Sequence, residues 1–133
     1  MRILTLLLFL MPFLESCKGQ TKVTTAPDEI TIDIKDIDVP TAKKMLAESN
    51  DFVLLDVRTP AEIAKGKIGE ALEMDINSPD FNQSLATLDK TKPYIVYCAV
   101  GGRSSKAMAV MKELGFTKVY NMMGGYNQWS SPE

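Results

Sequence analysis

Histidine is absent from this sequence of 133 residues, and cysteine occurs only twice, at Cys17 and Cys98. The lack of histidine excludes Cys–His dyads, Ser–His–Asp triads and zinc sites built from imidazole ligands. The two cysteines do not form a C-x-x-C pair, which argues against a dithiol redox cycle. A reactive thiol in this chain must therefore be activated without an imidazole base.

Features typical of nucleic-acid-binding proteins are also missing. The chain has no basic stripe, no run of like charge and no internal repeat, and its formal net charge is −2. Nucleic acid is therefore not an expected partner. No metal or cofactor is expected either, so the chemistry is expected to come from the side chains and the backbone.

The N-terminus begins with a charged start and a short apolar run, residues 3–10. This run is too short for a mature membrane span and is typical of a secretion signal. It leads to Leu14-Glu15-Ser16-Cys17, which resembles the bacterial lipoprotein cleavage box, although Glu15 is atypical there. We therefore expect residues 1–17 to be a signal peptide and Cys17 to be lipidated.

These expectations imply an exported protein, held by lipid to a membrane on the periplasmic or cell-envelope side. Two alternatives are cleavage as an ordinary signal peptide near Ser16 and retention as an uncleaved anchor. Residues 18–29 have little apolar content and are expected to form a flexible tether. Residues 30–133 are then one domain, long enough for a modest core.

Strand and helix patterns alternate through this domain. The expected strands are 30–34, 52–56, 71–74, 94–97 and 116–121. The expected helices are 42–48 with Thr41 as N-cap, a short one near Pro60, 81–88, 105–114 with Gly115 as C-cap, and a short one after Gly124-Gly125. Such alternation predicts an α/β fold with a mostly parallel sheet of about five strands and helices on both faces.

Cys98 directly follows the apolar strand 94–97 and precedes the helix predicted at 105–114. The turn between them contains Gly101 and Gly102. Glycines allow successive N–H groups to point inward, and a helix N-terminus favours negative charge. A thiol in this position should have a lowered pKa, which makes Cys98 the candidate nucleophile. The alternative is an inert buried cysteine at a strand end.

Arg103 stands five residues after Cys98, giving C-x-x-x-x-R. This spacing resembles the active-site loop of rhodaneses, sulfurtransferases that carry sulfur as a cysteine persulfide. Cysteine phosphatases and arsenate-reducing relatives have a loop one residue longer, so they are a weaker alternative. The backbone expected to hold the anionic sulfur belongs to Ala99, Val100, Gly101, Gly102 and Arg103. Arg103 is expected to add positive charge or to brace the loop.

A second segment resembles the N-terminal rhodanese signature, D-V-R-x-x-x-E. Asp56, Arg58 and Glu62 match it position by position, whereas Lys67 stands where the family usually has histidine. The resemblance implies that the three matching residues support the Cys98 loop. The alternative is that Arg58 and Glu62 form a solvated surface pair of little energetic value.

A third segment, L-G-F-x-x-V-Y-N-x-x-G-G-x-x-x-W, resembles the end of rhodanese domains. Gly124 and Gly125 within it are expected to let the backbone pass close to the Cys98 loop. Tyr126 and Trp129 are expected to be ordinary core residues. The three motifs together imply a single-domain rhodanese-like fold over nearly all of residues 30–129.

The resemblance implies a sulfurtransferase that takes sulfane sulfur from thiosulfate, a persulfide or a polysulfide. A Cys98 persulfide would then pass the sulfur to a thiol or to cyanide, and the donor could be a protein persulfide. A non-catalytic binding or sulfur-carrier module is the competing hypothesis. Because no cationic side chain lies between Cys98 and Arg103, we expect thiosulfate to be a poorer donor than a persulfide.

Overall fold

The computed structural model describes residues 29–132. The strands in this range are β1 (Asp33–Ile37), β2 (Val53–Asp56), β3 (Leu72–Glu73), β4 (Tyr94–Tyr97) and β5 (Lys118–Met122). The helices are α1 (Val39–Glu48), α2 (Pro60–Ile63), α3 (Phe81–Ala86), α4 (Gly102–Glu113) and α5 (Gly125–Trp129). The predicted alternation of strands and helices is confirmed.

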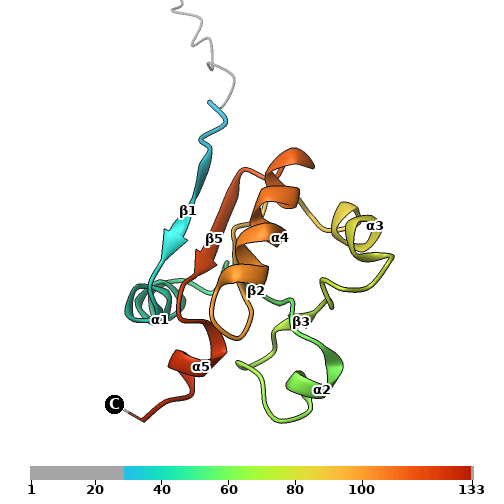
Figure 1. The fold of residues 1–133 in the computed structure, drawn as a ribbon. Coiled ribbons are helices and arrows are strands. Elements are labelled where there is room, and N and C mark those ends of the chain that lie inside the picture. The colour runs from blue at the N-terminus through green and yellow to red at the C-terminus, as the bar shows by residue number, and fades with distance from the viewer. Residues whose placement is uncertain (1–28, 133) are drawn as a thin grey trace, which may run out of the picture.

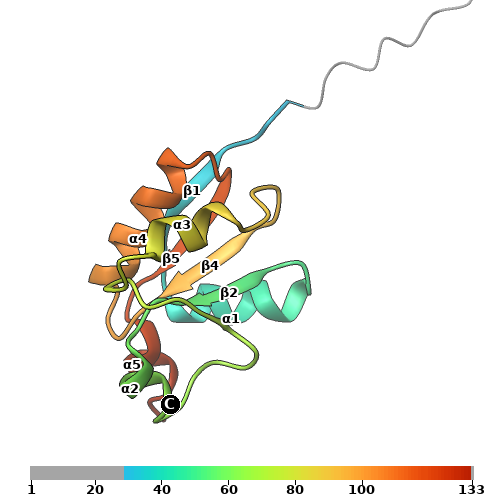
Figure 2. The ribbon, with the colours of Figure 1, turned by 90° about the vertical axis from the view of Figure 1, so that its right-hand side faces the viewer.

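The strands form one parallel sheet in the order β1-β5-β4-β2-β3. Strand β4 lies at its centre, and all four of its residues are buried. Helices α3 and α4 cover one face, whereas α1 and α5 cover the other (Figures 1 and 2). The predicted α/β fold, with helices on both faces of a parallel sheet, is therefore confirmed.

Each face of the sheet has its own apolar core. The core under α3 and α4 is centred on Leu55, Leu85, Val96, Ala107, Met111 and Val119. The core under α1 and α5 is centred on Ile37, Ala42, Ile95, Tyr97 and Met122. Side chains of successive strand residues point to opposite faces, so β4 contributes to both cores. As expected, Tyr126 and Trp129 pack against the second core.

The first strand begins three residues later than predicted. Ile30 and Ile32 suggested a strand at 30–34, but their side chains are 74% and 67% exposed. The ladder with β5 instead runs from Asp33 to Ile37. Burial of one face is what fixes the pairing register of a strand. Ile30 and Ile32 are not buried, so their alternation does not determine where β1 begins. The expectation that this strand lies at an edge of the sheet is confirmed.

Two helix starts also differ from the predictions. The N-cap of α1 is Asp38 rather than Thr41, and its carboxylate accepts a hydrogen bond from the Thr41 amide at 2.9 Å. Helix α4 begins at Gly102 instead of residue 105, so Arg103 lies in its first turn. Gly115 follows the last helical turn, as predicted, with a φ of 91° that suits glycine.

The predicted strand at 71–74 is reduced to Leu72–Glu73, and the helix predicted at 81–88 ends at Ala86. Strand β3 is an edge strand with both residues exposed, so it buries too little to extend further. None of the helices within residues 29–132 is long and apolar enough to cross a membrane. The predicted signal peptide, Cys17 and nearly all of the tether lie outside the described residues.

Candidate active site around Cys98

The carboxyl ends of three neighbouring strands bring the candidate residues to one edge of the sheet. Asp56 ends β2, Cys98 follows β4, and Met123 follows β5. Because β2, β4 and β5 are adjacent and parallel, these three positions lie side by side. This edge is where open α/β sheets bind ligands.

The thiol of Cys98 is buried at this edge. Its side chain is 1% exposed and packs in the same core as Val96, Ala107 and Met111. It forms no disulfide bond.

The N-terminus of α4 points at the Cys98 sulfur. Gly101, the N-cap residue, has a φ of 121°, a conformation that side chains rarely adopt. Its amide donates a hydrogen bond to Cys98 Sγ at 3.1 Å. The helix has 12 residues, so the positive end of its dipole also favours a negative sulfur.

Ser104 gives the sulfur a hydroxyl neighbour. Its side chain is fully buried, and Oγ lies 3.4 Å from Cys98 Sγ and 3.1 Å from the Gly101 carbonyl oxygen. A hydroxyl donates one hydrogen, so it can serve one of these acceptors at a time. Donation to the sulfur is strongest when the sulfur is an anion.

Two opposing influences set the pKa of the Cys98 thiol. Burial raises this pKa, because a charge is less stable away from water. The Ser104 hydroxyl and the amides of Ser104, Gly101 and Val100 lower it by donating to the thiolate. The donors outweigh the burial, and the pKa lies below the ordinary value for a thiol. The loop thus provides activation without an imidazole.

Helix α5 holds the outer side of the same loop. The amides of Tyr126, Asn127 and Gly124 donate to the carbonyls of Cys98, Ala99 and Val100, at 2.8, 3.0 and 3.0 Å. With their carbonyls held outward in this way, the peptide groups of the loop turn their amides towards the sulfur.

Gly125 makes this close approach possible. Its φ is +54°, and a Cβ at this position would overlap the carbonyl groups of Cys98 and Ala99. The contact between the glycine pair and the loop, which the sequence predicted, is present.

Arg103 pairs with Glu62 of α2, and its guanidinium also interacts electrostatically with Cys98. Its Nη1 and Nη2 lie 2.8 and 2.6 Å from Glu62 Oε2 and Oε1, and both side chains are about one-third exposed. Glu62 Oε2 also accepts from the Thr59 amide and hydroxyl, which completes a capping box at the start of α2. Arg103 and these donors lower the pKa of Glu62 to about 2. The pair ties α2 to the first turn of α4.

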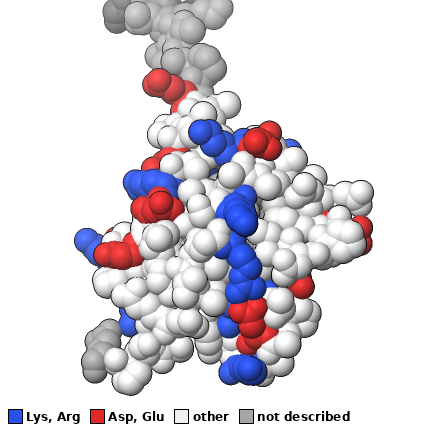
Figure 3. All heavy atoms as spheres, in the orientation of Figure 1, with Lys and Arg blue, Asp and Glu red and all other residues white. Residues whose placement is uncertain are grey.

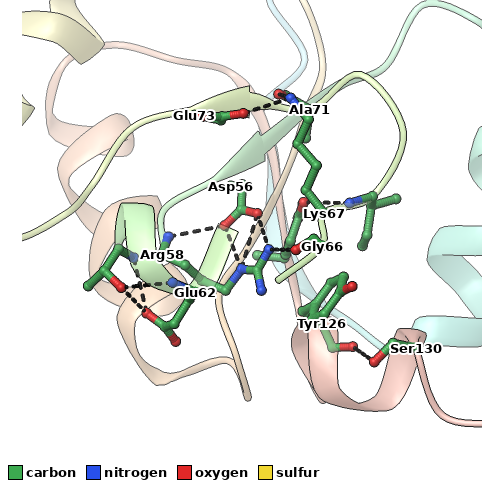
Figure 4. Close-up of polar contacts among 12 residues, drawn as sticks. Asp56, Arg58, Glu62, Gly66, Lys67, Ala71, Glu73, Tyr126 and Ser130 are labelled. Carbon is green, nitrogen blue, oxygen red and sulfur yellow. Dashed lines mark hydrogen bonds and ion pairs between the residues drawn. The ribbon is translucent and has the colours of Figure 1, made fainter. Parts of the chain in front are cut away.

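Asp56 and Arg58 form a second ion pair that is fully buried, with side chains 0% and 3% exposed. Arg58 Nε and Nη2 donate to Asp56 at 2.9 and 2.6 Å, and Nη2 also donates to the Gly66 carbonyl at 2.7 Å (Figure 4). The guanidinium lies 4.0 Å from the centre of the Tyr126 ring. Because the Tyr126 amide donates to the Cys98 carbonyl, Arg58 reaches the loop indirectly through α5.

Lys67, which stands where rhodaneses usually have histidine, lies on the outside of this cluster. Its ammonium is 2.7 Å from Glu73 Oε1 and 3.4 Å from the Ala71 carbonyl (Figure 4). The contact joins the loop after α2 to strand β3, which is a structural role.

The structure brings the predicted residues together in three groups. The amides of Val100 and Gly101 donate to the Cys98 sulfur, Glu62 pairs with Arg103 beside the loop, and Asp56 pairs with Arg58 in the interior. The alternative of a solvated pair between Arg58 and Glu62 is wrong, because the two residues have different partners.

Sequence reasoning missed two contributors to the site. Ser104 and the α5 amides were not assigned to it, although both now contact the Cys98 loop. The sequence did offer one signal for Ser104: a hydroxyl residue that directly follows Arg103, at the start of the helix predicted after the Cys98 loop. Within residues 29–132, no group of three or more acidic, Cys or His side chains is placed to hold a metal ion.

Comparison with known proteins identifies the class. The family model for the rhodanese-like domain matches residues 38–132. A sulfurtransferase from Allochromatium vinosum is 34% identical over 97 residues, covering 73% of this chain and 89% of the relative. A putative sulfurtransferase, YtwF, from Bacillus subtilis is 34% identical over 98 residues, covering 74% and 92%.

A solved structure agrees with these relatives. The rhodanese-like domain protein from Staphylococcus aureus superimposes with a TM-score of 0.66 and 30% identity, over 73% of this chain and 92% of that one. The fold is thus a parallel α/β domain with a thiol loop at the strand ends. The chain belongs to the rhodanese-like domain family.

Proposed function

We propose that this protein is a sulfurtransferase that carries sulfane sulfur as a persulfide on Cys98. The observation that carries the proposal is the buried Cys98 thiol, which accepts from the Gly101 amide and the Ser104 hydroxyl at the N-terminus of α4. Its lowered pKa supplies the nucleophile that sulfur transfer needs. The related sulfurtransferases support the same reaction class.

The reaction has two balanced steps. The Cys98 thiolate attacks the sulfane sulfur of the donor; a new S–S bond forms at Sγ, and the donor's bond to that sulfur breaks. The electron pair of the broken bond leaves with the rest of the donor, as sulfite from thiosulfate or as a thiolate from a persulfide. A thiol or cyanide then attacks the outer sulfur and regenerates the Cys98 thiolate.

The loop would stabilise the terminal sulfur as an oxyanion hole stabilises oxygen. Amides of Val100, Gly101 and Ser104 face the sulfur, and the Ser104 hydroxyl can donate to the charged form. Glu62 holds the guanidinium of Arg103 in a two-pronged ion pair, and the positive charge of Arg103 also favours an anionic sulfur at Cys98.

Intact mass spectrometry tests the proposal. The protein, treated with thiosulfate or polysulfide, should gain the mass of one sulfur atom and lose it again on addition of cyanide. Cys98→Ser should gain nothing, and equal loading of this variant would contradict the proposal. Loading that no acceptor removes would indicate a sulfur carrier instead of a transferase.

We also propose export and lipid anchoring at Cys17, supported by the sequence of residues 1–17. The expressed full-length protein should partition into detergent and carry acyl groups, and Cys17→Ala should abolish both. Recovery of a soluble wild-type protein without acyl groups would contradict this proposal and leave the sulfur chemistry untouched.

A further inference from the structure

Asn121 is a buried polar residue whose hydrogen bonds are incomplete. It lies in β5, opposite Val96 of β4 and Asp36 of β1, and its side chain is 0% exposed. Its Nδ2 donates to Asp36 Oδ1 at 2.8 Å and to Met123 Sδ at 3.3 Å. Among the buried side-chain nitrogen and oxygen atoms of residues 29–132, its Oδ1 is the one without a hydrogen-bond partner. A buried polar atom in this state requires an explanation.

Asp36 determines which way the amide of Asn121 faces. If the amide were turned over, Oδ1 would meet the carboxylate of Asp36, and two acceptors cannot bond to each other. Both hydrogens of the NH₂ group are therefore used, one on Asp36 and one on Met123, and Oδ1 is left unpaired. Because an apolar side chain would avoid this cost at a buried position, the useful part of Asn121 is its pair of donors.

Met123 connects this hydrogen bond to the Cys98 loop. The amide of the next residue, Gly124, donates to the Val100 carbonyl at 3.0 Å. The Sδ and Cα of Met123 would lie 3.2 and 3.4 Å from a Cβ on Gly101, so Met123 packs directly against this glycine. Gly101 is the N-cap of α4, and its amide donates to Cys98 Sγ.

The side chain of Met123 is only partly held by packing, because it is 45% exposed. Methionine is unbranched and has three rotatable side-chain bonds, so a half-exposed methionine can adopt several conformations. The hydrogen bond from Asn121 restricts these rotations and keeps the thioether against Gly101.

We propose that Asn121 is a positioning residue for the Cys98 loop: it fixes Met123 against Gly101, and Gly101 then presents its amide to the sulfur. The inference rests on the proposed function, in which that sulfur is the carrier. The contacts begin at Asp36, an exposed residue of the edge strand β1, and run through β5 to the N-terminus of α4.

Asn121→Leu tests the proposal, because it preserves the approximate size of the side chain and removes both donors. Asp36 is exposed, so water can replace its lost partner, and the unpaired oxygen disappears. The midpoint of urea denaturation should therefore stay at or above that of the wild type. Cys98 should nevertheless react about fivefold to tenfold more slowly, because the donor that faces its sulfur is less well placed.

Three measurements report on the loop in this variant. The first is the rate of alkylation of the Cys98 peptide by iodoacetamide at neutral pH, and the second is kcat for sulfur transfer from thiosulfate to cyanide. The third is hydrogen exchange of the Gly101 amide, which should be faster than in the wild type at equal global stability. A residue that served only the fold would give the opposite result, with lower stability and unchanged reactivity.

Two further variants test the same contacts from either side of Asn121. Met123→Leu removes the thioether acceptor but keeps an apolar side chain, and it should slow Cys98 about as much as Asn121→Leu does. The double variant should be no slower than either single one, because both remove the same contact. Asp36→Ala frees the amide of Asn121 to turn over and should act in the same direction, with a smaller loss.

Asp51→Ala is the matched control for Asp36→Ala. Asp51 is also exposed, but it precedes β2, at the end of the sheet opposite to Cys98. Figure 3 shows acidic and basic side chains mixed along the β1 side of the molecule, so the loss of one carboxylate there exposes no large patch of one sign. Cys98 in Asp51→Ala should react within about twofold of the wild type.

Wild-type reactivity of Cys98 in both Asn121→Leu and Met123→Leu would overturn the inference, as would losses that add up in the double variant. Lower stability of Asn121→Leu with unchanged reactivity in Met123→Leu would also overturn it. In each case the wild type would still acquire sulfur, and the proposed function would stand. Failure of wild-type Cys98 to acquire sulfur would overturn the proposed function, whereas the iodoacetamide rates would still test the role of Asn121.

Discussion

The two ion pairs near the Cys98 loop, Asp56–Arg58 and Glu62–Arg103, differ in nearly every physical respect. Asp56 and Arg58 are two residues apart and buried; Arg58 also donates to the Gly66 carbonyl and lies over the Tyr126 ring. Glu62 and Arg103 are 41 residues apart and about one-third exposed. One pair lies within the base of the site, whereas the other joins two helices at its surface.

The difference in burial indicates different roles for the two pairs: the buried pair stabilises the fold, and the exposed pair positions helix α4. Removing one member of a buried pair leaves an uncompensated charge away from water, which is costly. Water and salt can replace either partner of an exposed pair, so the pair contributes little to folding. We therefore expect Asp56 and Arg58 to maintain the fold beneath the loop, and Glu62 and Arg103 to keep the first turn of α4 in place.

The largest effect is expected for the buried pair. Asp56→Ala should lower the free energy of unfolding by about 3–5 kcal/mol, because Arg58 would keep its charge without a partner. Urea denaturation measures this change. Asp56→Leu combined with Arg58→Met, which removes both charges, should cost less than Asp56→Ala alone. A loss below about 1 kcal/mol would mean that the pair behaves like an exposed one.

Gly125 should show the next largest effect, on catalysis more than on folding. In Gly125→Ala, the new Cβ would push against the carbonyls of Cys98 and Ala99 and displace the loop. Sulfur transfer should fall by about a hundredfold, as expected for a misplaced reacting group. Gly69→Ala is the matched control: its φ of +48° gives similar backbone strain, but no atom lies within 4 Å. Equal activity losses in the two variants would show that strain alone is responsible.

Ser104 should affect the sulfur directly. Ser104→Ala removes the hydroxyl donor and should raise the pKa of Cys98, with a fall of about tenfold in the rate of alkylation at neutral pH. The control is Ser105→Ala, since Ser105 is exposed and one residue along the same helix. If both variants titrate as the wild type does, the hydroxyl serves only the Gly101 carbonyl.

The smallest change in stability is expected for the exposed pair. The folded pKa of Glu62, about 2, lies below that of an unfolded glutamate, so its stabilisation is present above about pH 5 and is lost as the pH falls towards 2. Glu62→Gln should cost less than about 1 kcal/mol at pH 7. Its difference from the wild type should shrink on acidification. A difference that grew with falling pH would contradict the assignment.

The sequence was most informative where a motif and a strand end coincided. The apolar residues at 94–97 predicted β4, and the glycines after Cys98 predicted a helix N-terminus facing the thiol. The start of β1 could not be predicted, because Ile30 and Ile32 alternate like a strand but have no partner strand beside them. Local pattern determines propensity, whereas pairing determines register.

The ion-pair partners of Arg58 and Glu62 could not be predicted from the sequence either. Arg58 and Glu62 are close in the chain and were considered as a pair. In the structure, Arg58 pairs with Asp56 in the interior, and Glu62 pairs with Arg103 near the surface. The α5 hydrogen bonds to the Cys98 loop come from a segment over 20 residues away in the chain, and only the glycine pair hinted at them.

The central claim, that backbone amides and one hydroxyl activate Cys98 without a base, is tested most directly by titrating this thiol. Thiolate absorbance of the folded domain, followed against pH with Cys98→Ser as a blank, gives the pKa. The account predicts a value clearly below the 8.5 or so of an unperturbed thiol. A value at or above that of an unperturbed thiol would contradict it, and Cys98 would then be an inert buried cysteine.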